Sequence, residues 1–305
     1  MQSSKRLWII ALMMVLALVA AACGDDDEGA DDTEAGGNGE TEAEEFEEGT
    51  PMAEFQEEGE VTIGVKFDVP PFGFENPQSG EVEGFDVDMG NYIADKLGVE
   101  ANFIEAISDN RIPFLADGTA DLILSTMTIT TDRDTEIDFS RPYYVARGRI
   151  LVPEGSDIAG VDDLGGTRVC TALGSTYEAT LAEQAPDAEL DLVDAYSECL
   201  EKIQNESVDA VSTDDVILTG MIIQDESLQL VGEPLTTEPY GVGIAEGETE
   251  LAEFLDATVE ESFEDGTWDE LYEEWVGQFT GEEAEHPEGL TLEDAYELFP
   301  CDETC

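Results

Sequence analysis

Basic residues are scarce in this chain, and three of them stand at the ends of predicted strands. The sequence has 11 Lys plus Arg against 75 Asp plus Glu. Lys66, Arg111 and Arg133 lie at strand ends or in the adjoining turns, where α/β proteins place their ligand sites. We therefore expect these three cations to hold an anionic ligand. On composition alone, residues such as Lys66 and Arg111 are more often surface cations.

A hydroxyl-rich run precedes Arg133 and is suited to a carboxylate. Ser125, Thr126 and Thr128 follow a predicted strand and offer hydroxyls and free backbone groups. A guanidinium a few residues further on can hold both oxygens of a carboxylate. In the alternative interpretation these residues cap the next turn, and Arg133 pairs with a neighbouring aspartate.

The second half of the chain offers a seat for an anion and an acid. Gly174, Ser175 and Thr176 join a predicted strand to a helix, where free N–H groups and the helix dipole favour an anion. Ser and Thr are also ordinary helix caps. Asp214 follows a predicted strand and would either hold an ammonium group or cap the next helix.

The elements that position these residues alternate along the chain. β-rich runs and amphipathic segments from residue 61 onward predict βα units and largely parallel sheets. We expect strands at 61–65, 101–104, 120–124, 168–172, 190–193, 210–212 and 228–231. We expect helices at 85–97, 108–116, 175–184, 196–205, 214–224, 250–264 and 268–279. The last helix places Trp268, Leu271, Tyr272 and Trp275 on one face, which predicts a core stripe.

Two extended runs, 145–152 and 240–245, look like crossovers between two lobes. Residues 59–147 plus 240–281 would form lobe 1, and residues 148–239 would form lobe 2. The expected fold class is therefore α/β, with two lobes joined by two hinge crossovers.

The N-terminal segment has the pattern of an export signal. Residues 1–22 have a basic start, an apolar run and a small-residue exit before Cys23. This exit resembles a bacterial lipoprotein signal, which predicts lipidation of Cys23 and an extracytoplasmic chain anchored to the outer face of the membrane. The alternative is an ordinary cleaved signal with an incidental cysteine. Residues 23–58 are acidic and poor in apolar side chains, which predicts a disordered tether. Residues 282–305 form a tail.

Four cysteines remain if Cys23 carries lipid, an even number for an oxidising compartment. Cys170 ends a predicted strand and Cys199 lies in a predicted helix, and we predict that they form a disulfide. Cys301 and Cys305 in the tail are candidates for a second pair. Zinc binding is the competing interpretation, but the chain has one His and the Cys spacings are not those of metal sites.

Charge and missing motifs exclude several classes of function. A net charge of −64 argues against nucleic acid and anionic membrane surfaces as partners, and it indicates a saline habitat in which salt screens self-repulsion. No Gly-Lys pair forms a phosphate-binding loop, no GxGxxG follows a strand, and one His makes an imidazole-based triad improbable. We expect no cofactor, no metal and no catalytic residue.

Several motifs together resemble a known family. Residues 61–68, 84–88, 125–133, 139–144, 162–166 and 208–214 are similar, in this order, to the extracellular solute-binding proteins of polar amino-acid ABC transporters. The similarity covers nearly all of residues 59–281 and is greatest to glutamate and aspartate binders, including glutamate-binding lipoproteins of actinobacteria. It implies the type II fold of periplasmic binding proteins, hinge closure on the ligand, a monomer, and a permease partner with a separate ATPase.

The resemblance also implies roles for individual residues. It places the α-carboxylate on Arg133, with Thr128 and the backbone near Thr126 assisting, and the α-ammonium on Asp214. Lys66 stands where binders of basic amino acids have an acid. Cys170 and Cys199 match a cysteine pair of the glutamate group. Val69 replaces an aromatic residue of many relatives, so that Phe72 or Tyr240 would supply the aromatic wall.

Charge arithmetic favours an acidic ligand. Three cations and Asp214 leave a net +2 in the site, which a dicarboxylic amino acid lowers and a neutral one does not. One unpaired buried cation costs on the order of 3 to 5 kcal/mol, more than the ~1 to 3 kcal/mol of one methylene. We therefore expect glutamate, with aspartate as the shorter candidate. The alternatives are a neutral polar ligand such as glutamine, an enzyme on the same scaffold such as a cyclohexadienyl dehydratase, and a sensory domain.

Overall fold

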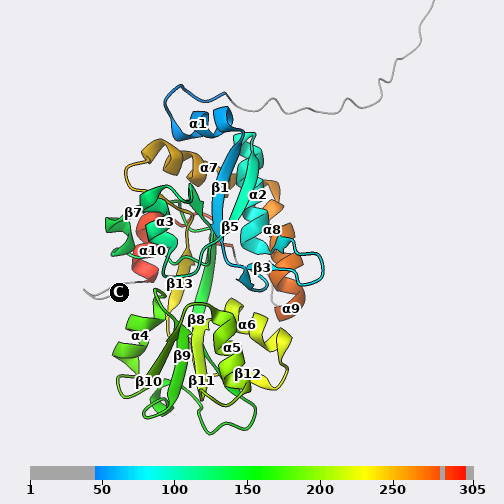
Figure 1. The fold of residues 1–305 in the computed structure, drawn as a ribbon. Coiled ribbons are helices and arrows are strands. Elements are labelled where there is room, and N and C mark those ends of the chain that lie inside the picture. Colours follow the sequence, from blue (N-terminus) through cyan, green and yellow to red (C-terminus); the bar gives the residue numbers. More distant parts are fainter. Residues whose placement is uncertain (1–44, 282–285, 300–305) are drawn as a thin grey trace, which may run out of the picture. The chain divides into compact units, whose positions relative to one another are not determined.

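The computed structural model describes residues 45–281 and 286–299, which contain two main β-sheets (Figure 1). The first sheet has the order β5 (Glu100–Glu105), β1 (Glu60–Val65), β6 (Leu122–Ile123), β14 (Gly243–Ala245) and β7 (Ile137–Phe139). In it, β1 is parallel to β5 and β6, whereas β14 is antiparallel to β6 and β7. This sheet belongs to the lobe that the sequence predicted from two separate stretches of chain.

The second sheet has the order β10 (Glu189–Val193), β9 (Arg168–Ala172), β11 (Ala210–Asp214), β8 (Tyr144–Pro153) and β12 (Leu228–Val231). A further strand, β13 (Thr237–Tyr240), pairs with the first half of β8. The strands β9, β10 and β11 are parallel, and β8 is antiparallel to β11 and β12. The antiparallel pair β8–β13 carries the chain between the two sheets, so the two-lobed α/β prediction is confirmed.

Helices flank both sheets. Beside the first sheet are α1 (Pro51–Glu58), α2 (Phe85–Leu97), α3 (Arg111–Asp117), α7 (Thr249–Asp265), α8 (Thr267–Tyr272) and α10 (Leu292–Leu298). Beside the second are α4 (Tyr177–Gln184), α5 (Tyr196–Gln204) and α6 (Asp215–Gln224). The short helix α9 (Gln278–Thr280) contacts α6 of the second lobe. Short 3-10 turns occur at Arg133–Thr135 (η1) and Val161–Asp163 (η2). No helix of the described residues has the length and apolar content of a membrane span.

The structure corrects the predicted tether at its C-terminal end. Residues 51–58 form α1, which begins at an N-cap, Thr50, whose hydroxyl accepts from the amide of Ala53. Gly59 ends the helix in the left-handed conformation. Met52 and Phe55 are buried in the core. Two apolar side chains at helical spacing were enough to fold this stretch, although its composition is acidic. The predicted disulfide of the tail and the lipidation site at Cys23 lie outside the described residues.

The predicted helix 268–279 is interrupted. A π-helical turn, η3 (Glu273–Gly277), separates α8 from α9. The core stripe is nevertheless present, because Trp268 and Tyr272 are buried and the Trp268 indole donates to the carbonyl of Tyr143 at 2.7 Å. This bond ties α8 to the residue that precedes β8.

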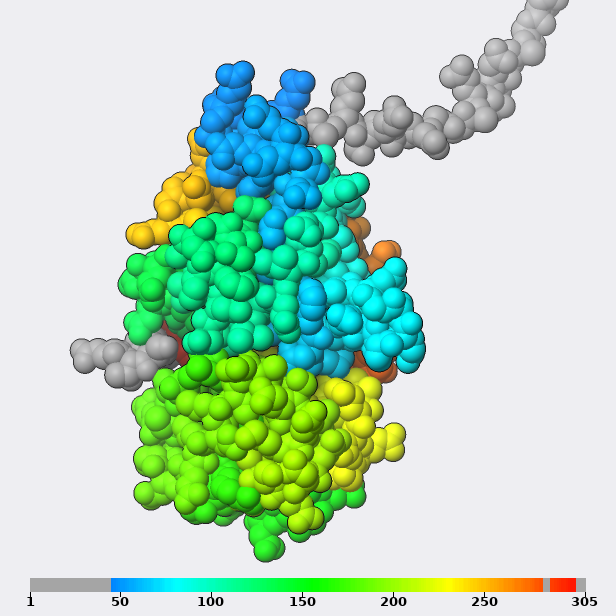
Figure 2. Space-filling view, viewed as in Figure 1, coloured from blue at the N-terminus to red at the C-terminus, as the bar shows by residue number. Residues whose placement is uncertain are grey.

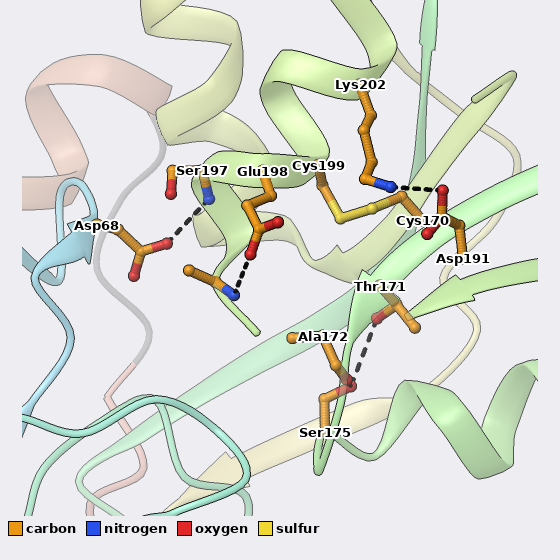
Figure 3. The surroundings of a disulfide bond; sticks show 11 residues. Asp68, Cys170, Thr171, Ala172, Ser175, Asp191, Ser197, Glu198, Cys199 and Lys202 are labelled. Atoms are coloured by element: carbon orange, nitrogen blue, oxygen red, sulfur yellow. Dashed lines mark hydrogen bonds and ion pairs between the residues drawn. A yellow bond between two sulfur atoms is a disulfide. The ribbon is translucent and has the colours of Figure 1, made fainter. Parts of the chain in front are cut away.

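A small sheet that the sequence did not predict follows β1. It consists of β2 (Asp68–Val69), β3 (Gly73–Glu75) and β4 (Val82–Glu83). It reaches the second lobe, because the Asp68 carboxylate accepts from the Ser197 amide at the N-terminus of α5, at 2.9 Å (Figure 3). Figure 2 shows the blue segment with β2 and β3 lying against the yellow segment with α6.

The predicted disulfide is confirmed. Cys170 in β9 and Cys199 in α5 are bonded, with their Cα atoms 5.6 Å apart (Figure 3). The bond fixes α5 on the second sheet. The helix begins with Tyr196, whose side chain reaches the candidate site.

Candidate functional site

A narrow polar cavity lies between the two lobes. From the first lobe it is lined by Ser108, Arg111, Thr126, Thr128 and Arg133. From the second it is lined by Ser175, Thr176, Tyr177, Tyr196 and Asp214. Its volume of about 10 Å³ is room for about one water molecule. Seven of the twelve ligand residues predicted from the sequence therefore converge on one place.

Arg133 enters the cavity from the turn η1. Its side chain is nearly buried, and its guanidinium donates to the carbonyls of Thr128 at 2.7 Å and Gly174 at 3.2 Å. Burial, together with the nearby positive charge of Arg111, lowers the pKa of Arg133 to about 9. In the described chain, the guanidinium of Arg133 forms no ion pair with a neighbouring aspartate, which was the alternative interpretation.

Arg111 joins the two lobes. From the start of α3 it donates to the carbonyls of Ser108 at 3.1 Å, Ser125 at 2.9 Å and Thr126 at 3.1 Å. Its other terminal nitrogen donates to the Gly174 carbonyl at 3.3 Å. Most of its N–H groups are therefore engaged by backbone, and burial lowers its pKa. The helix predicted to begin at Ser108 begins at Arg111 instead, and Ser108 lines the cavity.

Lys66 follows β1 and is 2 % exposed. Its ammonium donates to the Ser108 hydroxyl at 2.8 Å and lies 5.9 Å from the centre of the Tyr196 ring. Burial and the positive charge of Arg111 lower its pKa well below the ordinary value. Within the described ranges, Lys66 forms no ion pair with a carboxylate. Ser108 lines the cavity and Lys66 does not, so the ammonium lies behind the Ser108 hydroxyl.

Thr126 has an unusual backbone that an aspartate holds in place. Its φ of 45° is in the left-handed region, which is costly for a β-branched residue. Its amide donates to the buried Asp86 carboxylate at 2.9 Å, and the Tyr143 hydroxyl donates to the same group at 2.7 Å. Burial raises the pKa of Asp86 to about 7. Asp86 belongs to one of the motifs that suggested the family, but no site role had been assigned to it.

Asp214 ends β11 with its carboxylate turned to the cavity. The Tyr177 hydroxyl donates to it at 2.8 Å. Burial raises its pKa, and the negative charge of Glu238 adds to this effect. Its side chain makes no cap hydrogen bond with α6, and neither does that of Thr176 with α4. The capping alternatives for these two residues are therefore not what the structure shows.

Glu238 is a second buried acid that the sequence reasoning missed. It lies on β13 and is fully buried. One carboxylate oxygen accepts from the hydroxyls of Thr128 at 2.6 Å and Thr176 at 3.1 Å, and the other accepts from Thr236 at 2.6 Å. Burial raises its pKa. The available signal was an acid two residues before the extended run predicted at 240–245, in a stretch that the structure shows as β13, where a buried charge needs a partner.

The remaining predicted residues lie behind the cavity wall. The Ser125 hydroxyl donates a hydrogen bond to the Ala106 carbonyl, and the Gly174 carbonyl accepts hydrogen bonds from Arg111 and Arg133. Phe72 and Tyr240, the expected aromatic wall, are fully buried against one another, with ring centres 5.9 Å apart, and do not line this cavity. The aromatic side chains that line it are Tyr177 and Tyr196.

The charge count from the sequence also needs correction. Three cations, Lys66, Arg111 and Arg133, are buried together as expected. In the described chain, Asp214 is not the only buried acid near them. Glu238 accepts a hydrogen bond from the Thr128 hydroxyl at the cavity wall, and Asp86 accepts one from the Thr126 amide. The site therefore has three cations and three acids, and the net +2 expected from the sequence was wrong.

The comparisons with known proteins agree on the type of protein, a protein that binds a solute, but not on the ligand. The model of the bacterial extracellular solute-binding proteins, family 3, matches residues 61–278. The chain is 38 % identical to the ABC transporter glutamine-binding protein GlnH of Bacillus subtilis, over 89 % of this chain and 97 % of GlnH. It is 32 % identical to the glutamate-binding protein GluB of Corynebacterium efficiens, over 73 % of this chain and 80 % of GluB. Among solved structures, an ancestral arginine-binding protein bound to glutamine has 37 % identity and a TM-score of 0.69, covering 72 % of this chain and 98 % of that one.

Proposed function

Because this chain belongs to the bacterial extracellular solute-binding proteins of family 3, and serves as the amino-acid-binding protein of an ABC transporter, we propose that its ligand is glutamate. The α-carboxylate binds Arg133, and the α-ammonium binds Asp214 from the opposite lobe. The side-chain carboxylate points toward Ser108 and Lys66. Each charged group of the ligand then meets a buried group of opposite charge.

The observation that carries this proposal is the environment of Lys66. Its ammonium is buried and donates a hydrogen bond to the Ser108 hydroxyl. Burial lowers the pKa of this group, and the negative charges of Asp68 and Asp86 offset the effect only in part. Neither carboxylate forms an ion pair with it in the described chain, and a buried cation without a paired carboxylate is costly. A ligand that brings a second carboxylate to this end of the cavity would remove the cost, and a ligand with a side-chain amide would not.

Capture proceeds by movement of the lobes about β8 and β13. In the described state the cavity is too small for an amino acid, and contacts such as Arg111 to Gly174 cross between the lobes. Opening about the paired strands admits the ligand. The closed form is stabilised because the ligand contacts Arg133 in one lobe and Asp214 in the other.

Glutamine is the second candidate. Two observations favour it: the 38 % identity to a glutamine-binding protein, and the balance of three buried cations by three buried acids. Because three acidic side chains accompany the three basic ones, the need for an additional negative charge on the ligand is smaller than the sequence indicated. With glutamate, Lys66 meets the side-chain carboxylate of the ligand, whereas with glutamine it meets an uncharged amide. Experiments on Lys66 can therefore separate the two candidates.

Calorimetric titration of the purified protein with glutamate, aspartate, glutamine and arginine tests the proposal. We expect glutamate to bind at least tenfold more tightly than glutamine, aspartate to bind detectably, and arginine not to bind. Tighter binding of glutamine than of glutamate would transfer the assignment to the second candidate. Binding of arginine alone would reject both.

The location and the partner follow from the family and the N-terminal sequence. The lipid on Cys23 would hold an extracytoplasmic protein at the membrane, where a permease with its own ATPase receives the ligand. Labelling of the expressed full chain with a radioactive fatty acid tests the anchor. We expect label in the unaltered chain and none in Cys23→Ala.

A further inference from the structure

Glu238 connects the hinge to both walls of the cavity. It lies on β13, one of the two crossover strands, with no exposed surface. One oxygen of its carboxylate accepts a hydrogen bond from Thr128 of the first lobe and another from Thr176 of the second. Glu238 does not line the cavity itself, whereas both threonines do.

These hydrogen bonds determine what the two hydroxyls offer to a ligand. A threonine hydroxyl has one proton and two lone pairs. Because both protons are donated to Glu238, the hydroxyls present lone pairs to the cavity. The Asp214 carboxylate at the same cavity also accepts. This part of the wall therefore suits a group that donates several hydrogen bonds, as an ammonium does, and disfavours a carboxylate.

Glu238 also changes the charge balance. Its carboxylate is near enough to Arg133 to contribute to the electrostatics of that guanidinium, and it raises the pKa of Asp214. A fixed negative charge behind the two threonines offsets one of the three buried cations. The preference for an anionic side chain on the ligand is thereby reduced.

We propose that Glu238 is a positioning and specificity-determining residue, which orients the Thr128 and Thr176 hydroxyls for the ligand's α-ammonium and limits the preference for acidic over neutral ligands. This inference rests on the proposed function for the identity of the ligand. It adds a role for a hinge residue that touches the ligand only through two hydroxyls.

Two substitutions separate the two parts of this role. Glu238→Gln removes the charge, yet its amide oxygen can still face Thr128 and Thr176 while its nitrogen faces Thr236. Glu238→Met removes the charge and every acceptor, which frees both hydroxyl protons. Thr236→Val is the control, because it removes a hydrogen bond to the same carboxylate and leaves those of Thr128 and Thr176 in place. Thr236 also contacts the Tyr177 hydroxyl, so binding of glutamine by this variant is measured as well.

Calorimetry with glutamate, glutamine and glutarate provides the readout. Glutarate lacks the α-ammonium, so the ratio of its Kd to that of glutamate reports what the ammonium contributes. We expect Glu238→Met to lower this ratio at least tenfold, and Thr236→Val to leave it within twofold. We expect Glu238→Gln to favour glutamate over glutamine by a further factor of about ten.

A merely structural role predicts a different pattern. If Glu238→Met weakens glutamate and glutarate by the same factor, and Glu238→Gln leaves the ratio of glutamate to glutamine unchanged, the proposal is overturned. If Glu238→Met does not fold, the Glu238→Gln ratio alone decides. If the unaltered protein binds neither amino acid, the proposed function fails instead, and the same comparison is made with the amino acid that binds and its analogue without the amine.

Discussion

At the scale of single residues, the cost of burying charge explains the site. The chain retains few cations, and it buries Lys66, Arg111 and Arg133 beside one cavity. Both arginines donate to backbone carbonyls, whereas Lys66 donates to a hydroxyl. The lysine is therefore the cation for which a ligand carboxylate has the largest effect.

Substitution of Lys66 tests this directly. We expect Lys66→Met to weaken glutamate binding about 30-fold or more, because loss of one partner of a buried charge pair costs about 2 to 5 kcal/mol. Glutamine binding should change less than tenfold, and thermal unfolding of the ligand-free protein should shift upward since a costly buried cation is gone. Lys96→Met, which removes a half-exposed ion pair with Glu261, is the control. Equal losses for the two ligands would contradict the role of Lys66.

Asp86 should make stability depend on pH. The folded protein holds the Asp86 proton up to a pKa of about 7, against an ordinary value of 3.8. Between these two values the folded state binds the proton and the unfolded state does not. This contribution to the free energy of unfolding is complete below pH ~4 and is lost as pH rises through 7, on the order of 4 kcal/mol.

Urea unfolding of ligand-free protein at pH 5 and pH 8 measures this dependence. We expect the unaltered protein to lose stability between the two, and Asp86→Asn to lose markedly less, whatever its absolute stability. Asp95→Asn, on the exposed side of the same helix, should retain the unaltered dependence. Identical pH dependence in Asp86→Asn and the unaltered protein would show that other groups are responsible.

At the scale of elements, the two lobes approach each other closely at two glycines, which have no side chain. Gly220 in α6 faces the Pro70 backbone of the small sheet, and a Cβ built there would lie 1.7 Å from the Pro70 oxygen. Gly174, before α4, has a φ of 72°, and a Cβ there would lie 2.6 Å from the Asp109 Cα. Both glycines allow backbone of one lobe to approach the other.

Gly220→Ala should therefore hinder closure without harming the lobe. Alanine is the better helix former by about 0.5 to 1 kcal/mol, so α6 itself should gain stability. Overpacking at the lobe contact typically costs about 1 to 3 kcal/mol, which predicts a loss of ligand affinity between about fivefold and 150-fold. Gly165→Ala, where the nearest atom is 3.8 Å away, should bind normally. Unchanged affinity in Gly220→Ala would mean that this contact is not part of the ligand-bound state.

The same scale shows what the sequence could predict. The helix 85–97 and the strands 168–172 and 228–231 have the predicted bounds, because each has a clear periodicity and a glycine or polar boundary. The small sheet was missed because two-residue strands carry no periodic pattern. Glu238 and Asp86 were missed because their partners, Thr176 and Tyr143 among them, lie far away in the sequence. Residue types at strand ends revealed the three cations and Asp214, but not the other two buried acids, Asp86 and Glu238.

At the scale of the whole molecule, the net charge of −64 acts on both stability and capture. Exposed charges repel one another over about 10 Å at 0.1 M salt and over about 3 Å at 1 M. Exposed ion pairs such as Arg168 with Asp209 offset little of this. The saline habitat that the net charge indicated stays a prediction.

Stopped-flow binding in 0.05 to 1 M NaCl tests the consequence for capture. An acidic surface repels an anion, so the association rate of glutamate should rise with salt, whereas that of zwitterionic glutamine should stay within about twofold. The difference between the two ligands removes any general effect of salt on the protein. A glutamate rate that falls as salt increases would refute the expected repulsion.

The Gly174 carbonyl has a bearing on the state without solute. Its oxygen accepts from Arg111 and from Arg133 of the opposite lobe. Both arginines therefore keep an acceptor while the lobes are together and empty, where a buried donor without one costs about 1 to 3 kcal/mol. When the lobes part, this oxygen leaves both arginines, so the contact lowers the free energy of the empty, shut protein and leaves a smaller share of that closing free energy to the solute.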